Sequence, residues 1–184
     1  MRYQRRRADK DRRKQEKLTA YDRNLKVLGD FPRSYVHQNG LWHRVAQCWM
    51  VGVSPAGTRV YLQRRSYEKR THPGRYDISS GGHVAAGEKV DIAMARELRE
   101  ETGYLADEWI SLGDFHPAPA YSDEYISMYM ARGLHAGRRH LDADEFLDVT
   151  RIPLAELLEE VMAGHISDAK TQTAILKAAR LLGV

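Results

Sequence analysis

Three glutamates near the middle of the chain have the type and spacing needed to bind a metal ion. Glu97, Glu100 and Glu101 fall within an arc of about 100° if residues 88–102 form an α-helix. Ala93 lies on the same side, so the acids border the face that packs against the protein. Like charges held there repel unless a cation compensates. Their hard oxygen ligands suit Mg²⁺, with Mn²⁺ as a substitute, and such ions polarise phosphates and activate water.

A surface helix without a metal is the alternative, since Arg96 and Arg99 could neutralise the same glutamates. Composition alone favours this alternative, and the metal site gains its support from the resemblance described next. Gly81 and Gly82 precede the helix, and a backbone without side chains can approach a metal ion and a phosphate closely.

The segment from Gly82 to Tyr104 resembles the signature of the Nudix hydrolases, G-x5-E-x7-R-E-U-x-E-E-x-G-U, in which U is aliphatic. The matching residues are Gly82, Glu88, Arg96, Glu97, Leu98, Glu100, Glu101 and Gly103. Tyr104 departs from the aliphatic residue at the last position. A chance match somewhere in the chain is on the order of 10⁻⁷, so the signal is specific.

This resemblance implies a role for each matching residue. The metal ligands that it implies are Glu97, Glu100, Glu101 and the carbonyl of Gly81. Arg96 and Glu88 would orient these ligands.

The stretch before the signature resembles the isopentenyl diphosphate isomerase branch of the same superfamily. The similar residues are Trp42-His43-Arg44, Leu62-Gln63-Arg64-Arg65-Ser66-Tyr67-Glu68-Lys69, Pro73-Gly74 and Gly82-His83. In that branch the residues matching Arg65 and Lys69 bind a diphosphate, and His83 lies within the phosphate loop. The alternative is that the side chains of Arg65 and Lys69 are merely solvated. Isomerase chemistry is not expected, because Gly81 stands where that branch has its catalytic cysteine.

The stretch after the signature resembles ADP-ribose pyrophosphatases instead. Pro119 lies fifteen residues past the signature, where that group has its proline, although Ala120 replaces the usual glycine. The other similar segments are 115–124, 142–146, 152–154 and 164–171. Glu124 could face the metal helix as a further ligand. A general base must deprotonate the attacking water, and the candidates are Glu145 and Glu101. Glu100 is the third predicted catalytic residue.

Composition limits the class of protein. The chain has 184 residues, of which 42% are hydrophobic and 29% charged, as in ordinary globular proteins. Cys48 is the only cysteine, which excludes an internal disulfide and suggests a cytoplasmic location. We expect neither a membrane span nor a signal peptide, because the apolar runs are short. The remaining histidines are scattered without metal-ligand spacing, and we interpret most as surface or structural residues.

The positive charge is concentrated at the N-terminus. Residues 1–17 hold nine Lys/Arg against three Asp/Glu, which leaves the other 167 residues slightly acidic and argues against a nucleic-acid partner. Leu18, Tyr21, Leu25 and Leu28 recur at helical spacing. We therefore predict a basic helical tail over residues 1–28, which would contribute to a homodimer.

The elements that must position the glutamates follow from periodicity and turn residues. We predict helices at 88–102, 153–164 and 168–182. The predicted strands are 44–53, 58–64, 76–79, 108–115, 124–132 and 146–151. This order indicates a single α/β domain over residues 29–184, in which the resemblance implies the Nudix fold, a mixed β-sheet sandwiched between α-helices.

The function expected from these patterns is Mg²⁺-dependent hydrolysis of a nucleoside diphosphate linked to a second group. ADP-ribose or a related sugar nucleotide is the first candidate for this small-molecule diphosphate substrate. One alternative is hydrolysis of an isoprenoid or other small diphosphate, which the upstream segment suggests. The others are a non-catalytic Nudix ligand sensor and a nucleic-acid-associated protein led by its basic tail.

Overall fold

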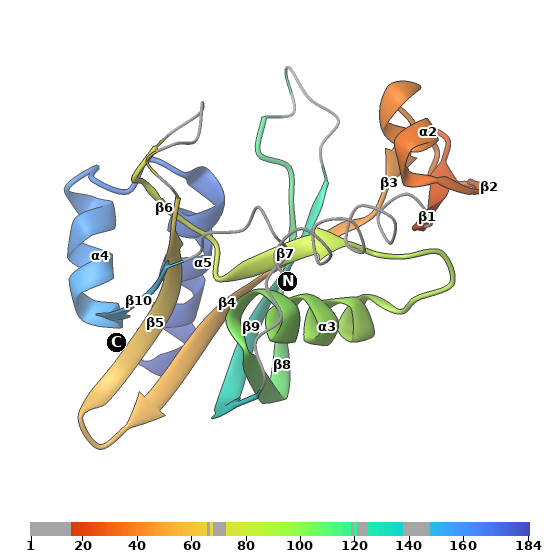
Figure 1. Cartoon of the computed structure of the whole chain (residues 1–184). Helices are drawn as coiled ribbons and strands as arrows, with labels where there is room; N and C mark the ends of the chain where they lie inside the picture. The colour runs from red at the N-terminus through yellow and green to blue at the C-terminus, as the bar shows by residue number, and fades with distance from the viewer. Residues whose placement is uncertain (1–15, 66, 68–72, 119, 121–124, 138–147) are drawn as a thin grey trace.

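The computed structural model describes residues 16–65, 67, 73–118, 120, 125–137 and 148–184, and its elements are labelled in Figure 1. In chain order these are β1 Lys17–Tyr21, β2 Val27–Pro32, α2 Arg33–Gln38, β3 Trp42–His43, β4 Val45–Ser54, β5 Gly57–Arg64, β6 Tyr76–Asp77, β7 Ser80–His83, α3 Val90–Thr102, β8 Tyr104–Phe115, β9 Ile126–Ala136, β10 Asp148–Pro153, α4 Leu154–Met162 and α5 Ala169–Leu182. None of the helices in these described segments is long and apolar enough to cross a membrane.

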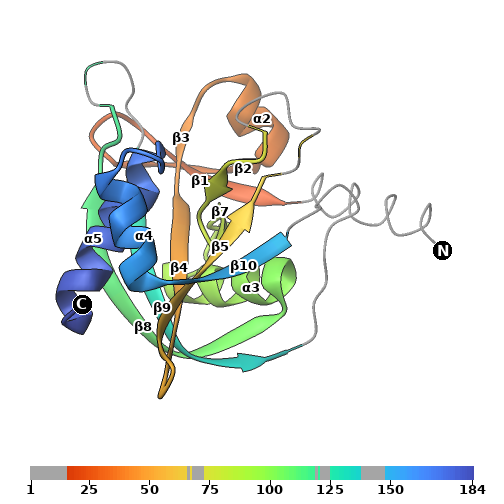
Figure 2. The ribbon, with the colours of Figure 1, turned by 90° about the vertical axis from the view of Figure 1, so that its left-hand side faces the viewer.

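A seven-stranded sheet forms the centre of the molecule. Its strand order is β10-β5-β4-β9-β8, with β6 paired to β5 and β7 paired to β4. The β4–β9 pair is parallel and the other pairs are antiparallel, so the predicted mixed sheet is confirmed. Figure 2 shows α4 and α5 on one face of this sheet and α3 on the other, which confirms the sandwich.

Alternation along β4 divides the core between these two faces. Trp49 packs into the cluster that includes Leu157 of α4 and Ile175 of α5. Its neighbour Met50 packs into a second cluster with Met94 of α3. Helix α3 is thereby held against the sheet along its apolar stripe, and its glutamates lie at the border of that stripe.

Local conformation and hydrogen bonding explain the end of α3 and the beginning of α5. Gly103 ends α3 in the left-handed conformation, with φ of 76°, which a residue without Cβ adopts readily. Asp168 caps α5, where its side chain accepts a hydrogen bond from the Thr171 amide at 2.9 Å.

The helix predicted for the end of the N-terminal tail is wrong, because the described part of that segment forms strands β1 and β2. The carboxylate of Asp22 accepts hydrogen bonds from the amides of Asn24 and Lys26, which stabilises a turn instead of a helix. Leu25 has a positive φ of 60°, and the chain reverses direction there. The apolar spacing that suggested a helix therefore spans a turn.

Strand β1, which lies within the predicted tail, pairs with strands of the predicted domain over residues 29–184. It pairs with β3 as well as with β2, and Leu18 forms a bridge with Ala85. Leu18 is fully buried, whereas Leu25 and Leu28 are more than half exposed. Leu18 is thus buried within the chain itself, without a second subunit. Residues 1–15 lie outside the described part.

Candidate functional site

The glutamates of α3 lie against the two glycines of β7. A Cβ atom added to Gly82 would lie 2.2 Å from the carboxyl carbon of Glu97, so the Glu97 side chain would have to move away. Glycine at this position lets the carboxylate of Glu97 lie against bare backbone. The side chains of Glu97 and Glu100 are only 16% and 24% exposed, although both carry carboxylates.

Glu101 contacts the neighbouring glycine of the same strand. Its Oε2 accepts hydrogen bonds from the Gly81 amide and from Nε2 of Gln63, each at 3.2 Å. The structure thus brings the predicted Glu97, Glu101 and Gly81 together along β7.

Arg96 connects the helix to the loop before it. Its Nε and Nη2 donate to the two carboxylate oxygens of Glu88, each at 3.0 Å, and Nη2 also donates to the His83 carbonyl at 3.1 Å. Its Nη1 donates to Glu97 at 2.7 Å and lies 3.7 Å from Glu100. This is the geometry expected of a residue that orients the acidic side chains, and the role itself stays a prediction.

The electrostatics of the cluster differ from one carboxylate to the next. Burial raises the pKa of Glu97 above its ordinary value, against the opposing effect of Arg96. Burial alone would also raise the pKa of Glu88, but hydrogen bonds from Arg96 and from the Ala85 amide hold it below its ordinary value. The hydrogen bond with Glu88 raises the pKa of Arg96, which stays charged.

These residues fit a hard divalent cation. Glu97, which is largely buried, favours its charged form less than an ordinary glutamate does, and an added positive charge would reverse that preference. Carboxylate oxygens and a backbone carbonyl are the ligands that Mg²⁺ and Mn²⁺ prefer. The bare backbone at Gly82 lets the carboxylate of Glu97 lie directly against β7.

The remaining predicted residues are divided between described and undescribed segments. Arg65 follows β5 and forms a 2.8 Å ion pair with Asp77 of β6. Its predicted role in binding phosphate stays a prediction. The other four predicted residues, Lys69, Pro119, Glu124 and Glu145, lie outside the described residues.

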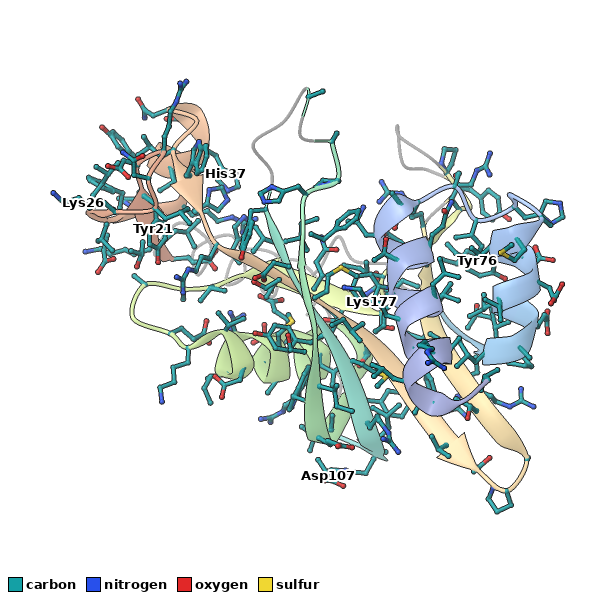
Figure 3. The ribbon with its side chains drawn as sticks, turned by 180° about the vertical axis from the view of Figure 1, so that it is seen from behind. Tyr21, Lys26, His37, Tyr76, Asp107 and Lys177 are labelled. Carbon is teal, nitrogen blue, oxygen red and sulfur yellow. The ribbon has the colours of Figure 1, made fainter. Side chains whose placement is uncertain are left out.

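His83, which we predicted to bind substrate, forms a cluster with two histidines that we interpreted as scattered surface or structural residues. His37 of α2, His43 of β3 and His83 of β7 place ring nitrogens within 4.8 Å of one another. The Nε2 atoms of His37 and His83 are 3.1 Å apart, and the three ring centroids are 5.0 to 5.1 Å apart. Figure 3 shows His37 turned toward the main sheet. Imidazole nitrogens in this number suit a transition metal ion such as Zn²⁺.

Sequence spacing gives no signal for this cluster, because the three histidines come from separate elements. The resemblance of Trp42-His43-Arg44 and Gly82-His83 to one superfamily branch was the available hint, since it selects two of the three. Burial, together with the charges of His43 and Arg33, lowers the pKa of His37. The imidazole is therefore held neutral, which is the form that binds metal ions.

A cavity of about 680 Å³ adjoins the histidine cluster between the N-terminal strands and the main sheet. Its lining includes His43, four aromatic side chains and one charged residue of each sign, namely Tyr21, Trp42, Tyr125, Tyr129, Arg44 and Asp114. This volume lies within the range of cavities that hold small molecules.

Comparisons with known proteins agree with the resemblances in the sequence. The family model of the NUDIX domain matches residues 43–171. An uncharacterized Nudix hydrolase of Clostridium acetobutylicum is 31% identical over 150 residues, which cover 78% of this chain and 72% of that protein. The ADP-ribose pyrophosphatase of Bacillus subtilis is 35% identical over 96 residues, which cover 51% of this chain and 52% of that enzyme. The chain therefore matches about half the length of that enzyme.

Two further comparisons concern the other branch and the fold. An isopentenyl-diphosphate Delta-isomerase of Mycolicibacterium vanbaalenii is 31% identical over 143 residues, which cover 75% of this chain and 77% of that enzyme. A solved structure from Deinococcus radiodurans superposes with a TM-score of 0.62 at 23% identity, covering 88% of this chain and 98% of the other. An ADP compounds hydrolase has the same TM-score at 24% identity, covering 78% of each chain. These two structures show the shared fold.

Proposed function

The chain belongs to the Nudix hydrolase family, and from this premise we propose that it is a Mg²⁺-dependent pyrophosphohydrolase. Its substrate would be a nucleoside diphosphate linked to a second group, with ADP-ribose or a related sugar nucleotide as the first candidate. The ADP-ribose pyrophosphatases of Bacillus subtilis and Mycobacterium tuberculosis, at 35% and 37% identity over about half the chain, support this choice. The observation that carries the proposal is the row of carboxylates from α3 against the bare backbone of Gly81 and Gly82.

In the proposed mechanism Glu97, Glu100 and Glu101 hold a divalent cation, which polarises the diphosphate and makes water more acidic when bound. The oxygen of water forms a bond to one phosphorus, the bridging P–O bond breaks, and a phosphate ester leaves with the bond electrons. Arg96 keeps Glu97 and Glu88 in place during this reaction. Arg65 and Lys69 would neutralise charge that develops on the phosphate oxygens.

The proton of the attacking water requires a base. We propose Glu145 or Glu101 for this role, and Glu124 as a further metal ligand. Glu145→Gln is expected to lower turnover with little change in substrate affinity, whereas Glu124→Gln is expected to weaken metal-dependent activity. If Glu145→Gln has no effect while Glu101→Gln abolishes turnover, the base is not Glu145.

A substrate panel tests the proposed function. ADP-ribose, other sugar nucleotides, dinucleoside polyphosphates and prenyl diphosphates are incubated with Mg²⁺ or Mn²⁺, and the products are identified by mass. We expect ADP-ribose to yield AMP and ribose 5-phosphate, and the Glu97→Gln variant serves as the inactive control. If no diphosphate is cleaved with either metal, the proposed function is wrong.

The second candidate is a hydrolase of an isoprenoid or other small diphosphate. The match to an isomerase over 143 residues favours it, and Gly81 at the position of that branch's cysteine excludes the isomerase reaction itself. Cleavage of a prenyl diphosphate in preference to sugar nucleotides would select this candidate. Binding of a panel member without turnover would indicate a ligand sensor.

We also propose a cytoplasmic homodimer, to which the N-terminal segment contributes. The exposed apolar side chains of Leu25, Val27 and Leu28 on the β1–β2 hairpin support an interface there. Deletion of residues 1–28 would remove β1 along with the tail, so substitution of Leu25 and Leu28 by Ser is the cleaner test. Light scattering should then report a monomer, and an unchanged mass would contradict this part of the proposal.

A further inference from the structure

Gln63 is an amide side chain buried in the centre of the main sheet. It lies on β5 between Asp77 of β6 and Val149 of β10, and only 8% of its surface is exposed. A buried amide is costly unless its polar atoms form hydrogen bonds. Its contacts therefore indicate what the residue does at this position.

The Nε2 atom of Gln63 donates two hydrogen bonds, one of which joins the sheet to α3. One goes to the Ser79 carbonyl at 2.8 Å and the other to Oε2 of Glu101 at 3.2 Å. An amide NH₂ group has two hydrogens, so these two bonds use its full donor capacity. The orientation of the amide is thereby fixed by its own partners.

Ser79, the first of these partners, is itself fixed. It is fully buried, and its amide donates to the Cys48 carbonyl at 3.1 Å. Its Oγ accepts a hydrogen bond from the Met50 amide at 2.7 Å and donates one to the Tyr61 carbonyl. Gln63 is thus anchored to a rigid point where β4 and β5 meet the turn before β7.

Glu101 is held by donors from two different strands. Its Oε2 accepts from Gln63 of β5 and from the Gly81 amide of β7. Two donors on a single oxygen restrict rotation of the carboxylate about its last bond. Metal ligands must be held within about 0.5 Å of their working geometry, and such supporting hydrogen bonds supply that restriction.

We propose that Gln63 is a positioning residue that holds Glu101 in the geometry for binding the divalent cation. This inference rests on the proposed function, since it requires Glu101 to be a metal ligand. Without the amide, Glu101 loses one of these two donors and samples rotamers that point away from the ion. Loss of an outer hydrogen bond of this kind typically weakens metal affinity or activity by about 10- to 100-fold.

The test is the Gln63→Met variant, which keeps the length of the side chain and removes both donors. Mn²⁺ affinity is measured by water proton relaxation in the full-length chain, with His37→Ala as the common background so that the histidine cluster does not contribute. We expect binding about 10-fold weaker or more. In activity assays, the metal concentration for half-maximal rate should rise by the same factor, with most of kcat restored at saturating metal.

Gln172→Met is the matched control. Gln172 of α5 also donates from Nε2 to a carbonyl, that of Ile166, but none of the described contacts links it to the glutamates. It should keep the Mn²⁺ affinity of the parent, which separates a general effect of losing an amide hydrogen bond from an effect on the metal ligand.

The outcomes distinguish this inference from the proposed function. If Gln63→Met folds and binds Mn²⁺ within twofold of the parent, Gln63 is not a positioning residue, while the proposed function stands. If the parent itself binds no Mn²⁺, both fail. Circular dichroism reports folding, and if Gln63→Met does not fold, Gln63→Asn is judged by the same twofold criterion, because its shorter amide cannot reach both partners.

Discussion

The glutamate cluster and the histidine cluster are two groups of metal-type ligands built in opposite ways. Glu97, Glu100 and Glu101 come from a single helix, whereas His37, His43 and His83 come from one helix and two strands. Among the described residues, the histidines form the tighter group, with ring nitrogens within 4.8 Å. Proximity in the sequence is therefore no guide to which ligands lie closest together in space.

Charge explains much of this difference. Ionised carboxylates repel one another, and the guanidinium of Arg96 lies between Glu97 and Glu100. The histidine side chains pack closely instead, and the rings of His43 and His83 stack with an interplanar angle of 17°. The carboxylates therefore need a cation to come together, whereas the histidines are brought together by the fold.

The largest expected effect is on the glutamate cluster. Glu100→Gln removes one ligand charge without removing volume, and we expect turnover to fall by at least about 100-fold while the fold remains intact. Steady-state hydrolysis of ADP-ribose with Mg²⁺ measures this. Glu108→Gln, on the exposed part of β8, is the control and should keep the parent rate. Parent turnover in Glu100→Gln would falsify the metal assignment.

The second largest effect is expected on stability, when the guanidinium of Arg96 is removed. Arg96→Met leaves Glu88 and Glu97 without their partner, and the partly buried position of Arg96 suggests a loss of about 2 kcal/mol in the free energy of unfolding. In a chain of this size that corresponds to a fall in Tm of roughly 4–8 °C. Calorimetry in a metal-free buffer measures it. An unchanged Tm would show that the carboxylates do not depend on Arg96.

Asp168 caps α5 through a contact with a residue three positions along the chain, and it belongs to neither the glutamate cluster nor the histidine cluster. Burial alone would raise the pKa of Asp168, but hydrogen bonds from Lys170 and Thr171 hold it below the ordinary value of 3.8. The stabilisation is therefore present above that pH and is lost as the pH falls through the lowered pKa.

The Asp168→Ala variant should consequently be less stable by about 1 kcal/mol at pH 7. Chemical denaturation of both proteins from pH 7 down to acid measures the difference, which should shrink once the pH passes below 3.8. A difference that is constant over this range would mean that the charge of Asp168 plays no part in the cap.

The smallest effect is expected for the histidine cluster without metal. His37 is exposed, so His37→Ala should cost less than about 1 kcal/mol in a metal-free buffer. Added Co²⁺ should raise the Tm of the parent and produce visible absorption bands, because a ligand that binds only the folded state stabilises it. Both responses should be lost in the variant. Equal responses in the two proteins would place the Co²⁺ elsewhere.

Local rules in the sequence were enough for the helix that carries the glutamates. The apolar stripe, the stop at Gly103 and the spacing of Glu97, Glu100 and Glu101 lie within a few turns, so helical geometry alone places these acids on one side. The helix predicted at 168–182 and the strands predicted at 44–53 and 58–64 also depend on local contacts, namely the Asp168 cap and the β4–β5 hairpin. The same rules failed at residues 18–28, because four spaced apolar residues do not reveal that Asp22 stabilises a turn between two strands.

The contacts between residues of different elements depend on the tertiary structure. His43 and His83 meet through strand register, with β1 pairing Ala20 to His43 and β4 pairing Val45 to His83. A slip of one residue would turn either imidazole to the opposite face of its sheet. Gln63 reaches Glu101 across 38 positions for the same reason. The placement of the acids on one helix follows from its sequence, since the helical period is local, whereas contacts between strands depend on pairing that no single segment encodes.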